Sequence, residues 1–166
     1  MPARKVLRYP HPSLKRQTVP LDPGSRDHLI NVGQDLVDTM RAHEGCVGLA
    51  APQIDELVRM LVVDVSEHPR AAASNGLLVL ANPRVVAASG SEVAREGCLS
   101  IPDFTANVRR ATEVVIEAIS PEAEELRIAS EGFEARCLLH ELDHLDGILF
   151  LDRVDSLKSD VFRRKR

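Results

Sequence analysis

The chain has 166 residues, a formal net charge of −4 at pH 7 and a hydrophobic fraction of 44%. This length suits a single domain, residues 1–166, with a sizeable core, and the negative charge argues against a general nucleic-acid-binding surface. Aromatic residues make up only 3% of the chain and Trp is absent, so few side chains could stack on nucleic-acid bases.

The cysteines and the hydropathy pattern indicate a cellular compartment. Cys46, Cys98 and Cys137 are odd in number and widely spaced, which does not indicate a disulfide framework. No apolar run approaches the roughly 20 residues that span a bilayer, and the N-terminus shows no targeting pattern. We therefore expect a cytoplasmic protein with reduced thiols and no membrane partner.

The first third of the chain predicts one long helix and one segment of close backbone approach. Four prolines keep residues 1–21 irregular, and apolar residues at helical spacing then predict a helix from Ser25, its N-cap, to His43, with Gly45 as the stop. Small residues in 47–53 let the backbone approach a ligand or a packed neighbour, and both interpretations remain open. Gln53 offers an amide donor just beyond this turn.

The middle of the chain predicts several short strands. Their order, between two helices, favours an α+β fold with mostly antiparallel strands around a central helix rather than a parallel sheet. Residues 68–76 are expected to form a surface loop. The runs rich in β-branched residues that predict the strands are Val58 to Asp64, Leu77 to Ala81, Arg84 to Ala88, Thr112 to Ile119 and Glu125 to Ala129.

The central helix carries an H-E-x-x-H motif at residues 140–144, and we expect Ser130 to cap it. His140 and His144 lie four residues apart, so both imidazoles can reach one metal ion, while Glu141 beside them can take a proton from a metal-bound water. The alternative is a helix with two exposed histidines. An apolar stripe on a neighbouring face argues for a packed helix instead: Leu138, Leu142 and Leu145.

A third metal ligand is missing downstream of the motif. The position that holds a histidine in metzincins is Phe150, and no Glu follows Leu145. Cys98, held at a bend between Gly97 and Pro102, is a candidate, because a thiolate and two imidazoles leave one tetrahedral position for water. A lone cysteine can also be a small buried hydrophobe, and Cys46 and Cys137 are competing thiols.

Three segments together resemble the peptide deformylases. These are Val47-Gly48-Leu49-Ala50-Ala51-Pro52-Gln53, Glu96-Gly97-Cys98-Leu99-Ser100 and His140-Glu141-Leu142-Asp143-His144. The resemblance implies a metal-dependent hydrolase that removes the formyl group from the N-terminal formylmethionine of newly synthesised polypeptides, with a metal-bound water as nucleophile. It implies Fe²⁺ as the metal, with Zn²⁺, Ni²⁺ or Co²⁺ as substitutes.

The resemblance also implies a role for each site residue. Glu141 becomes the general base and acid, and Gln53 and the Leu99 N–H bind the formyl oxygen. The implied metal ligands are Cys98, His140 and His144. The implied substrate-binding residues are Val47, Gly48 and Gly97, whose backbone pairs with the peptide, Cys137, which lines the methionine pocket, and Glu96, which pairs with Arg110 beneath it.

Two departures from the family pattern and several alternatives stay open. Cys46 stands where the family usually has Gly, and Leu139 where it usually has Gln. Rival functions are an endopeptidase with the same motif, a binding module on a closed structural metal site, and a deformylase relative with a shifted substrate. The basic tail, residues 162–166, is either solvated or contacts a polyanion such as the ribosome.

Overall fold

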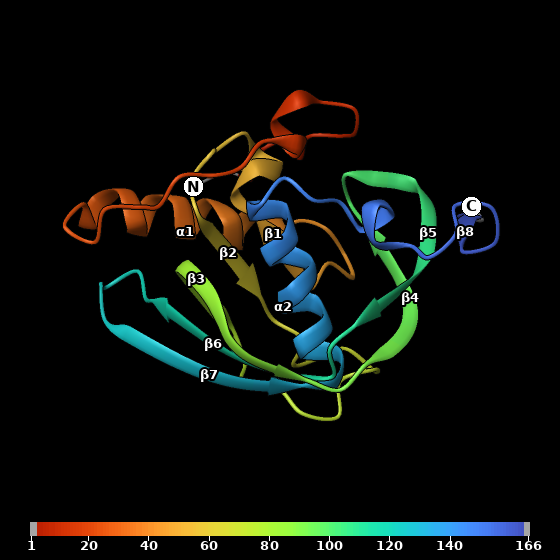
Figure 1. Ribbon diagram of the computed structural model, residues 1–166. Helices are drawn as coiled ribbons and strands as arrows, with labels where there is room; N and C mark the ends of the chain where they lie inside the picture. The colour runs from red at the N-terminus through yellow and green to blue at the C-terminus, as the bar shows by residue number, and fades with distance from the viewer. Residues whose placement is uncertain (1–2, 165–166) are drawn as a thin grey trace.

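The computed structural model describes residues 3–164 of the chain and shows two α-helices and eight strands there (Figure 1). The α+β prediction with mostly antiparallel strands is confirmed. No helix among residues 3–164 is long and apolar enough to cross a membrane. The elements are α1 (Arg26–Arg41), β1 (Gly48–Ala50), β2 (Met60–Val63), β3 (Leu78–Ser89), β4 (Glu92–Cys98), β5 (Ile101–Arg110), β6 (Glu113–Ile119), β7 (Glu125–Glu131), α2 (Gly132–Leu145) and β8 (Val161–Arg163).

A five-stranded antiparallel sheet, in the order β1-β2-β3-β6-β7, lies between the two helices. Strand β2 is buried on both faces, because successive side chains point to opposite sides. Met60 and Val62 pack in the cluster that contains α1, whereas Leu61 and Val63 pack in the cluster that contains α2. This explains why β2 is a continuous apolar run in the sequence rather than an alternating one.

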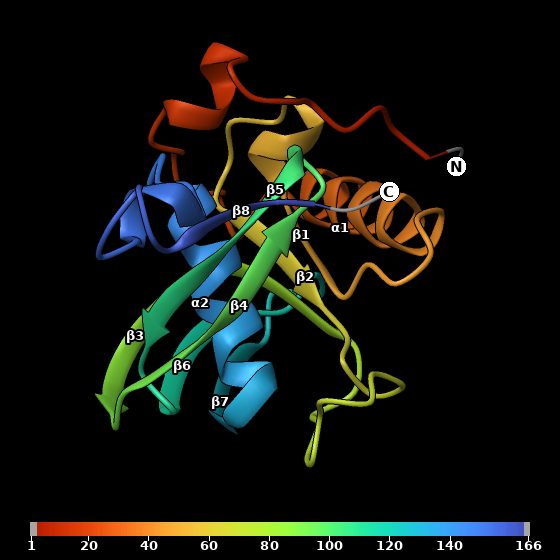
Figure 2. The ribbon, with the colours of Figure 1, turned by 90° about the vertical axis from the view of Figure 1, so that its right-hand side faces the viewer.

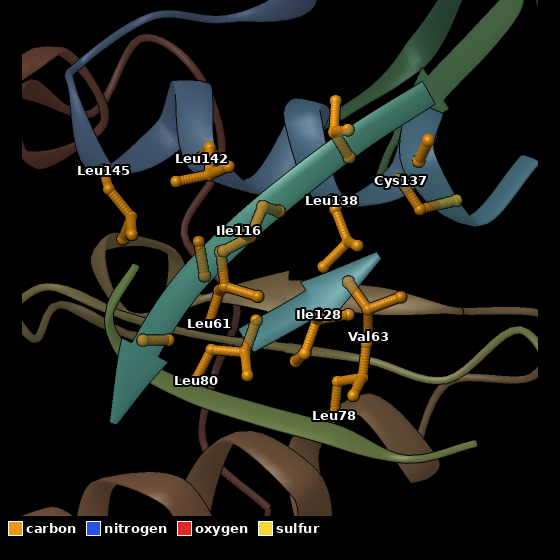
Figure 3. Packing of buried hydrophobic residues seen from close by; sticks show 14 of the residues in the cluster. Leu61, Val63, Leu78, Leu80, Ile116, Ile128, Cys137, Leu138, Leu142 and Leu145 are labelled. Atoms are coloured by element: carbon orange, nitrogen blue, oxygen red, sulfur yellow. The ribbon is translucent and has the colours of Figure 1, made fainter. Parts of the chain in front are cut away.

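The apolar stripe of α2 packs on this sheet, as the sequence predicted (Figure 3). Leu138 and Leu145 are completely buried, and Leu142 is 6% exposed. They pack with side chains of the central strands, among them Leu61 and Ile116. Packing of one helix face against the sheet fixes the rotation of α2, and that rotation decides where its polar residues point.

A second sheet, in the order β4-β5-β8, lies on the other side of α2 (Figures 1 and 2). Strands β4 and β5 form a hairpin whose tight turn joins Cys98 to Ile101. β1 is the outermost strand on one side of the first sheet, and β4 is the outermost strand on one side of the second. Both are therefore edge strands. Polypeptide pairing with such an edge needs only main-chain groups.

Several boundaries differ from the sequence predictions. Residues 77–81 and 84–88 were predicted as two strands, but β3 is one strand that passes Pro83 through a register shift between Ala81 and Arg84. A bulge tolerates proline because the ladder is locally interrupted there. Strands β1, β4, β5 and β8 were not predicted. The predicted cap of α2 was also wrong: Glu131 is the N-cap, and the Ser130 hydroxyl donates to Glu134.

Candidate metal centre

His140 and His144 lie one turn apart on α2, on the face beside its apolar stripe. Their rings approach edge to face with centroids 5.2 Å apart, and they are 8% and 1% exposed. The alternative of two exposed histidines is therefore wrong. Buried polar rings require partners, and these two share the space between the helix and the end of β4.

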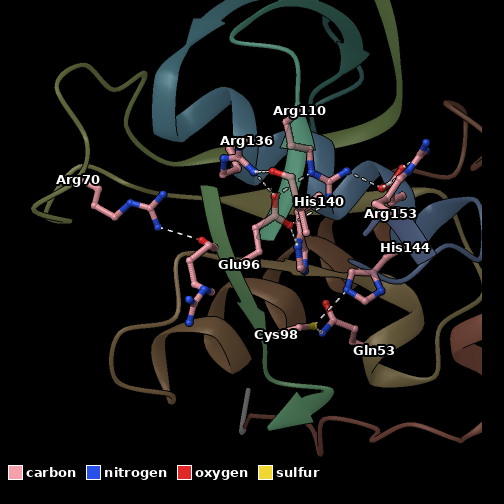
Figure 4. Close-up of polar contacts among 12 residues, drawn as sticks. Gln53, Arg70, Glu96, Cys98, Arg110, Arg136, His140, His144 and Arg153 are labelled. Atoms are coloured by element: carbon pink, nitrogen blue, oxygen red, sulfur yellow. Dashed lines mark hydrogen bonds and ion pairs between the residues drawn. The ribbon is translucent and has the colours of Figure 1, made fainter. Parts of the chain in front are cut away.

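Cys98, the last residue of β4, completes a cluster of three possible metal ligands (Figure 4). Its Sγ lies 3.4 Å from His144 Nε2. One donor atom from each of Cys98, His140 and His144 lies within 4.8 Å of the others. The fold thus brings together the thiol and the two imidazoles, which are far apart in the sequence.

The donor set suits a divalent transition metal. His140 Nδ1 lies 2.8 Å from a Glu96 carboxylate oxygen, which can only accept, so Nδ1 carries a proton and Nε2 is the nitrogen available to a metal. Carboxylate–histidine pairs of this kind orient metal ligands. His144 Nδ1 is buried and has no hydrogen-bond partner among residues 3–164. Burial and the neighbouring His140 lower the pKa of His144, which favours the neutral ring that binds metal.

Glu96 anchors this centre through a buried network of charges (Figure 4). It accepts two hydrogen bonds of 2.9 Å from Arg110, as the family resemblance implied, and one of 2.7 Å from Arg136, which the sequence analysis missed. Burial alone would raise the pKa of Glu96, but the hydrogen bonds from Arg110 and His140 outweigh burial and lower it. Glu96 therefore stays ionised and holds the His140 ring in place.

Glu141 lies next to the ligand cluster but outside it. Its side chain is buried, and its Oε1 has no hydrogen-bond partner among the described residues. Burial raises the pKa of Glu141 to about 7, so this carboxyl can exchange a proton at neutral pH. A Cβ on Gly48 would stand 2.7 Å from Glu141 Oε2, which explains the need for glycine on β1 here.

Gln53 and Leu99 lie on the same side of the cluster. The Gln53 side chain is fixed at both ends: its Oε1 accepts from the Ala50 N–H at 3.0 Å, and its Nε2 donates to Ser100 Oγ at 3.0 Å. The same Nε2 lies 3.5 Å from Cys98 Sγ. Leu99 follows Cys98 in the β4–β5 turn, and Leu99 and Gln53 both line the cavity beside the cluster. A fixed amide donor beside the cluster can bind an oxygen that develops negative charge.

An open cavity of about 370 Å³ connects the cluster to the surface. It lies between the free edges of β1 and β4 and includes every residue that the resemblance assigned to substrate. Additional lining residues escaped the sequence analysis, although Phe133, Cys137 and Glu141 follow helical spacing that could have indicated one face. The missed lining residues with charged or ring side chains are Glu44, His68, Arg70, Arg95, Phe133, Arg136 and Arg164.

The two departures from the family pattern fall on different sides of α2. Cys46 lines the cavity, and its backbone does not take the positive φ that would demand glycine. Burial raises the pKa of its thiol to about 12, so the protonated thiol donates to the Gly48 carbonyl at 3.2 Å. Leu139 instead packs at the edge of the core and lines a separate groove with Arg59 and Arg84.

Comparisons with known proteins agree with this geometry. The family model described as polypeptide deformylase matches residues 3–160. A peptide deformylase of Thermodesulfovibrio yellowstonii is 38% identical over 97% of this chain and 94% of its own length, and peptide deformylase 2 of Vibrio cholerae is 40% identical over 99% and 94%.

Solved structures lead to the same family. The peptide deformylase of Thermotoga maritima superposes with a TM-score of 0.84 at 29% identity, covering 94% of this chain and all of that one. A peptide deformylase of Acinetobacter baumannii, solved with Met-Ala-Ser bound, gives 0.84 at 30% identity over 92% of this chain and 98% of that one. With a Cys-His-His cluster beside a buried glutamate and matches over nearly its whole length, the chain belongs to the peptide deformylase family.

Proposed function

We propose that this chain carries out the family's reaction with a divalent metal held by Cys98, His140 and His144 and with Glu141 as the proton carrier. Removal of the N-formyl group from nascent peptides is the activity of peptide deformylases, and membership gives it to this chain. The observation that carries the assignment is the three-ligand cluster with Glu141 buried beside it and one of its oxygens free.

The edges of the two sheets support a mode of substrate binding. β1 and β4 are edge strands that border the cavity, so an extended peptide can pair with the segment of Val47 and Gly48 on one side and with Gly97 on the other. The Met-Ala-Ser complex of the similar A. baumannii enzyme supports a tripeptide in this position. The methionine side chain then enters the cavity beside Cys137, whose thiol is buried.

Each catalytic residue has a task that its surroundings support. A bound divalent metal supplies a Lewis acid that acidifies water and polarises the formyl oxygen. Glu141 takes a proton from the attacking water and returns it to the leaving amine, which its pKa of about 7 allows. Gln53 Nε2 and the Leu99 N–H donate to the oxygen that becomes negative as the carbonyl carbon turns tetrahedral.

Fe²⁺ is the proposed metal, with Zn²⁺, Ni²⁺ and Co²⁺ as substitutes. A thiolate with two imidazoles is a ligand set for these ions rather than for Mg²⁺ or Ca²⁺. The ligand group has three members among residues 3–164, which supports an open fourth position and argues against a closed structural site. Iron with a thiolate is sensitive to oxygen, so activity of iron-loaded protein should decay in air while that of nickel-loaded protein persists. Equal decay would argue against iron.

The proposed location is the cytoplasm, where nascent formylated chains arise. A ribosome contact through the basic tail remains a further part of the proposal. Within that tail Arg163 is exposed, whereas residues 165 and 166 lie outside the described part of the chain. Salt-sensitive co-sedimentation with ribosomes, lost when the basic residues of 163–166 are replaced by Ser, would test this contact.

The decisive experiment measures formate release from formyl-Met-Ala-Ser by anaerobically purified protein, with metal content read in parallel. Rapid release is expected for the wild type. Glu141→Gln should lose release and keep the metal, whereas Cys98→Ala should lose both. Cys46→Ala is the matched control, because its thiol lines the same cavity outside the ligand group and should leave metal content unchanged. Cleavage of an unformylated internal peptide, without formate release, would instead indicate an endopeptidase.

A further inference from the structure

Three arginines surround the open end of the cavity. Arg70, Arg95 and Arg164 line it, and none of them forms an ion pair within residues 3–164. Three carboxylates also line the cavity: Glu44, Glu96 and Glu141. Glu96 is engaged by two arginines and His140, and Glu141 lies beside the possible metal ligands. In a chain of net charge −4, the three arginines make the mouth a local positive region.

Arg164 lies directly over the strand edge that faces the cavity. Its backbone N–H donates to the Asp103 carbonyl at 2.8 Å, next to the β5–β8 pairing, so the start of the side chain is fixed. A Cβ on Gly97 would collide with Arg164 Nη2. The absence of a side chain at Gly97 therefore lets this guanidinium reach the peptide-binding edge.

Arg95 lies on the same face of β4, two residues before Gly97. Its guanidinium stacks 3.8 Å from the Phe162 ring centroid and donates to Thr105 Oγ1 and Asn107 Oδ1. These neutral contacts orient the cation and leave its charge uncompensated. Arg70 donates to the Arg95 carbonyl at 3.2 Å and so holds its own loop against the same strand (Figure 4).

Side chains of an extended peptide point alternately to opposite sides, and this alternation decides which substrate side chain lies near the arginines. Glu96 points to the inner face of β4, toward His140 and the methionine pocket, whereas Arg95 and Gly97 belong to the outer face. If the methionine side chain points inward, the next side chain of a strand-like peptide points outward. That side chain would lie beside Arg95 and Arg164.

We propose that Arg164 and Arg95 make this enzyme prefer formylated peptides with an acidic residue directly after formylmethionine. The inference rests on the proposed function, because it assumes that the peptide pairs with the edge of β4. Both arginines are specificity-determining residues that act on binding and orientation of the peptide rather than on the proton transfers.

The test compares kcat/KM for three C-terminally amidated peptides, formyl-Met-Asp-Ser, formyl-Met-Ala-Ser and formyl-Met-Lys-Ser, on metal-loaded protein. The amide removes a terminal carboxylate that would itself attract the arginines. We expect the Asp peptide to exceed the Lys peptide by about tenfold at low salt, the scale of two partly exposed charge pairs. Raising salt from about 50 mM to about 500 mM should shrink this ratio, because screening weakens exposed pairs.

Variants separate a charge effect from a structural one. Arg164→Ala should reduce the ratio of Asp to Lys peptide at least about threefold, and Arg164→Glu should reverse the preference. Arg163→Ala is the matched control, since Arg163 is the exposed neighbour that does not line the cavity. Equal loss on all three peptides in Arg164→Ala would overturn the proposal, as would equal rates on all three in the wild type. No formate from any peptide would instead overturn the proposed function.

Discussion

Gln53 provides the sharpest single-residue prediction. Its amide is held by Ala50 and Ser100, so the donor toward the cluster is oriented before substrate binds. Removing one such donor typically raises the barrier by about 3 kcal/mol, so Gln53→Ala should lower kcat roughly a hundredfold or more with metal content unchanged. Steady-state formate release checks this. Gln34→Ala, on the exposed face of α1, is the control, and near-full activity of Gln53→Ala would exclude the oxyanion role.

At this scale the sequence predicted residues whose role follows from short spacing or a shared motif. His140, Glu141 and His144 came from the H-E-x-x-H motif and the spacing of a helix. Cys98 became the candidate third ligand because no His or Glu at the expected positions follows the motif, and the family resemblance supported this choice. Arg95 and Arg164 could not be predicted, because their meeting requires β8 to pair with β5 across more than fifty intervening positions, a contact no local pattern reports.

The C-terminus of α2 gives a prediction at the scale of the element. Gly147 N–H donates to the His144 carbonyl and Ile148 N–H to the Asp143 carbonyl, which is a Schellman cap with Gly147 at φ +75°. A Cβ on Gly147 would also stand 2.7 Å from the Lys15 carbonyl oxygen. Gly147→Ala should therefore cost about 2 kcal/mol or more of unfolding free energy, measured by urea denaturation.

Gly76 offers a matched control for that substitution. It has φ +73°, but a Cβ placed there would meet no other atom within 4 Å, so Gly76→Ala carries the left-handed strain without the clash. The difference between the two variants isolates the contact with Lys15. Equal losses would mean that backbone conformation alone makes Gly147 necessary.

Most of the predicted elements have an apolar face or an apolar run, but β5 was missed although it buries Ile101, Ala106 and Val108. The helices, β6 and β7 bury hydrophobic residues at a regular spacing, and β2 is a continuous apolar run; both patterns are visible in the sequence. Strand β4 has Glu96 as its one buried residue, so its inward side chain is charged and no hydropathy pattern reveals it. Pro83 led to the prediction of two strands where the structure has only β3, because proline normally ends a strand. Here the register shift around Pro83 accommodates it.

For the whole molecule, strand order could not be predicted although the fold class was. The division into two sheets on either side of α2 depends on pairings between distant segments, and the three possible metal ligands come from both sides. Cys98 ends a strand of the three-stranded sheet, whereas both histidines belong to the helix that packs on the five-stranded sheet. A metal at this cluster would therefore add a link between these two layers, beside the hydrogen bonds of Glu96, Arg110 and Arg136 that already join them.

Metal binding should consequently stabilise the entire fold. Because a preformed site is absent from the unfolded chain, free metal at about 100 times its dissociation constant adds about 2.7 kcal/mol to the free energy of unfolding. Chelator treatment should lower the Tm, and adding Ni²⁺ or Zn²⁺ should restore it progressively as metal concentration rises. Cys98→Ala should lose most of this response, whereas Cys46→Ala should keep it, since only Cys98 belongs to the ligand cluster. An equal metal-dependent shift in both variants would show that the stabilising ion binds elsewhere.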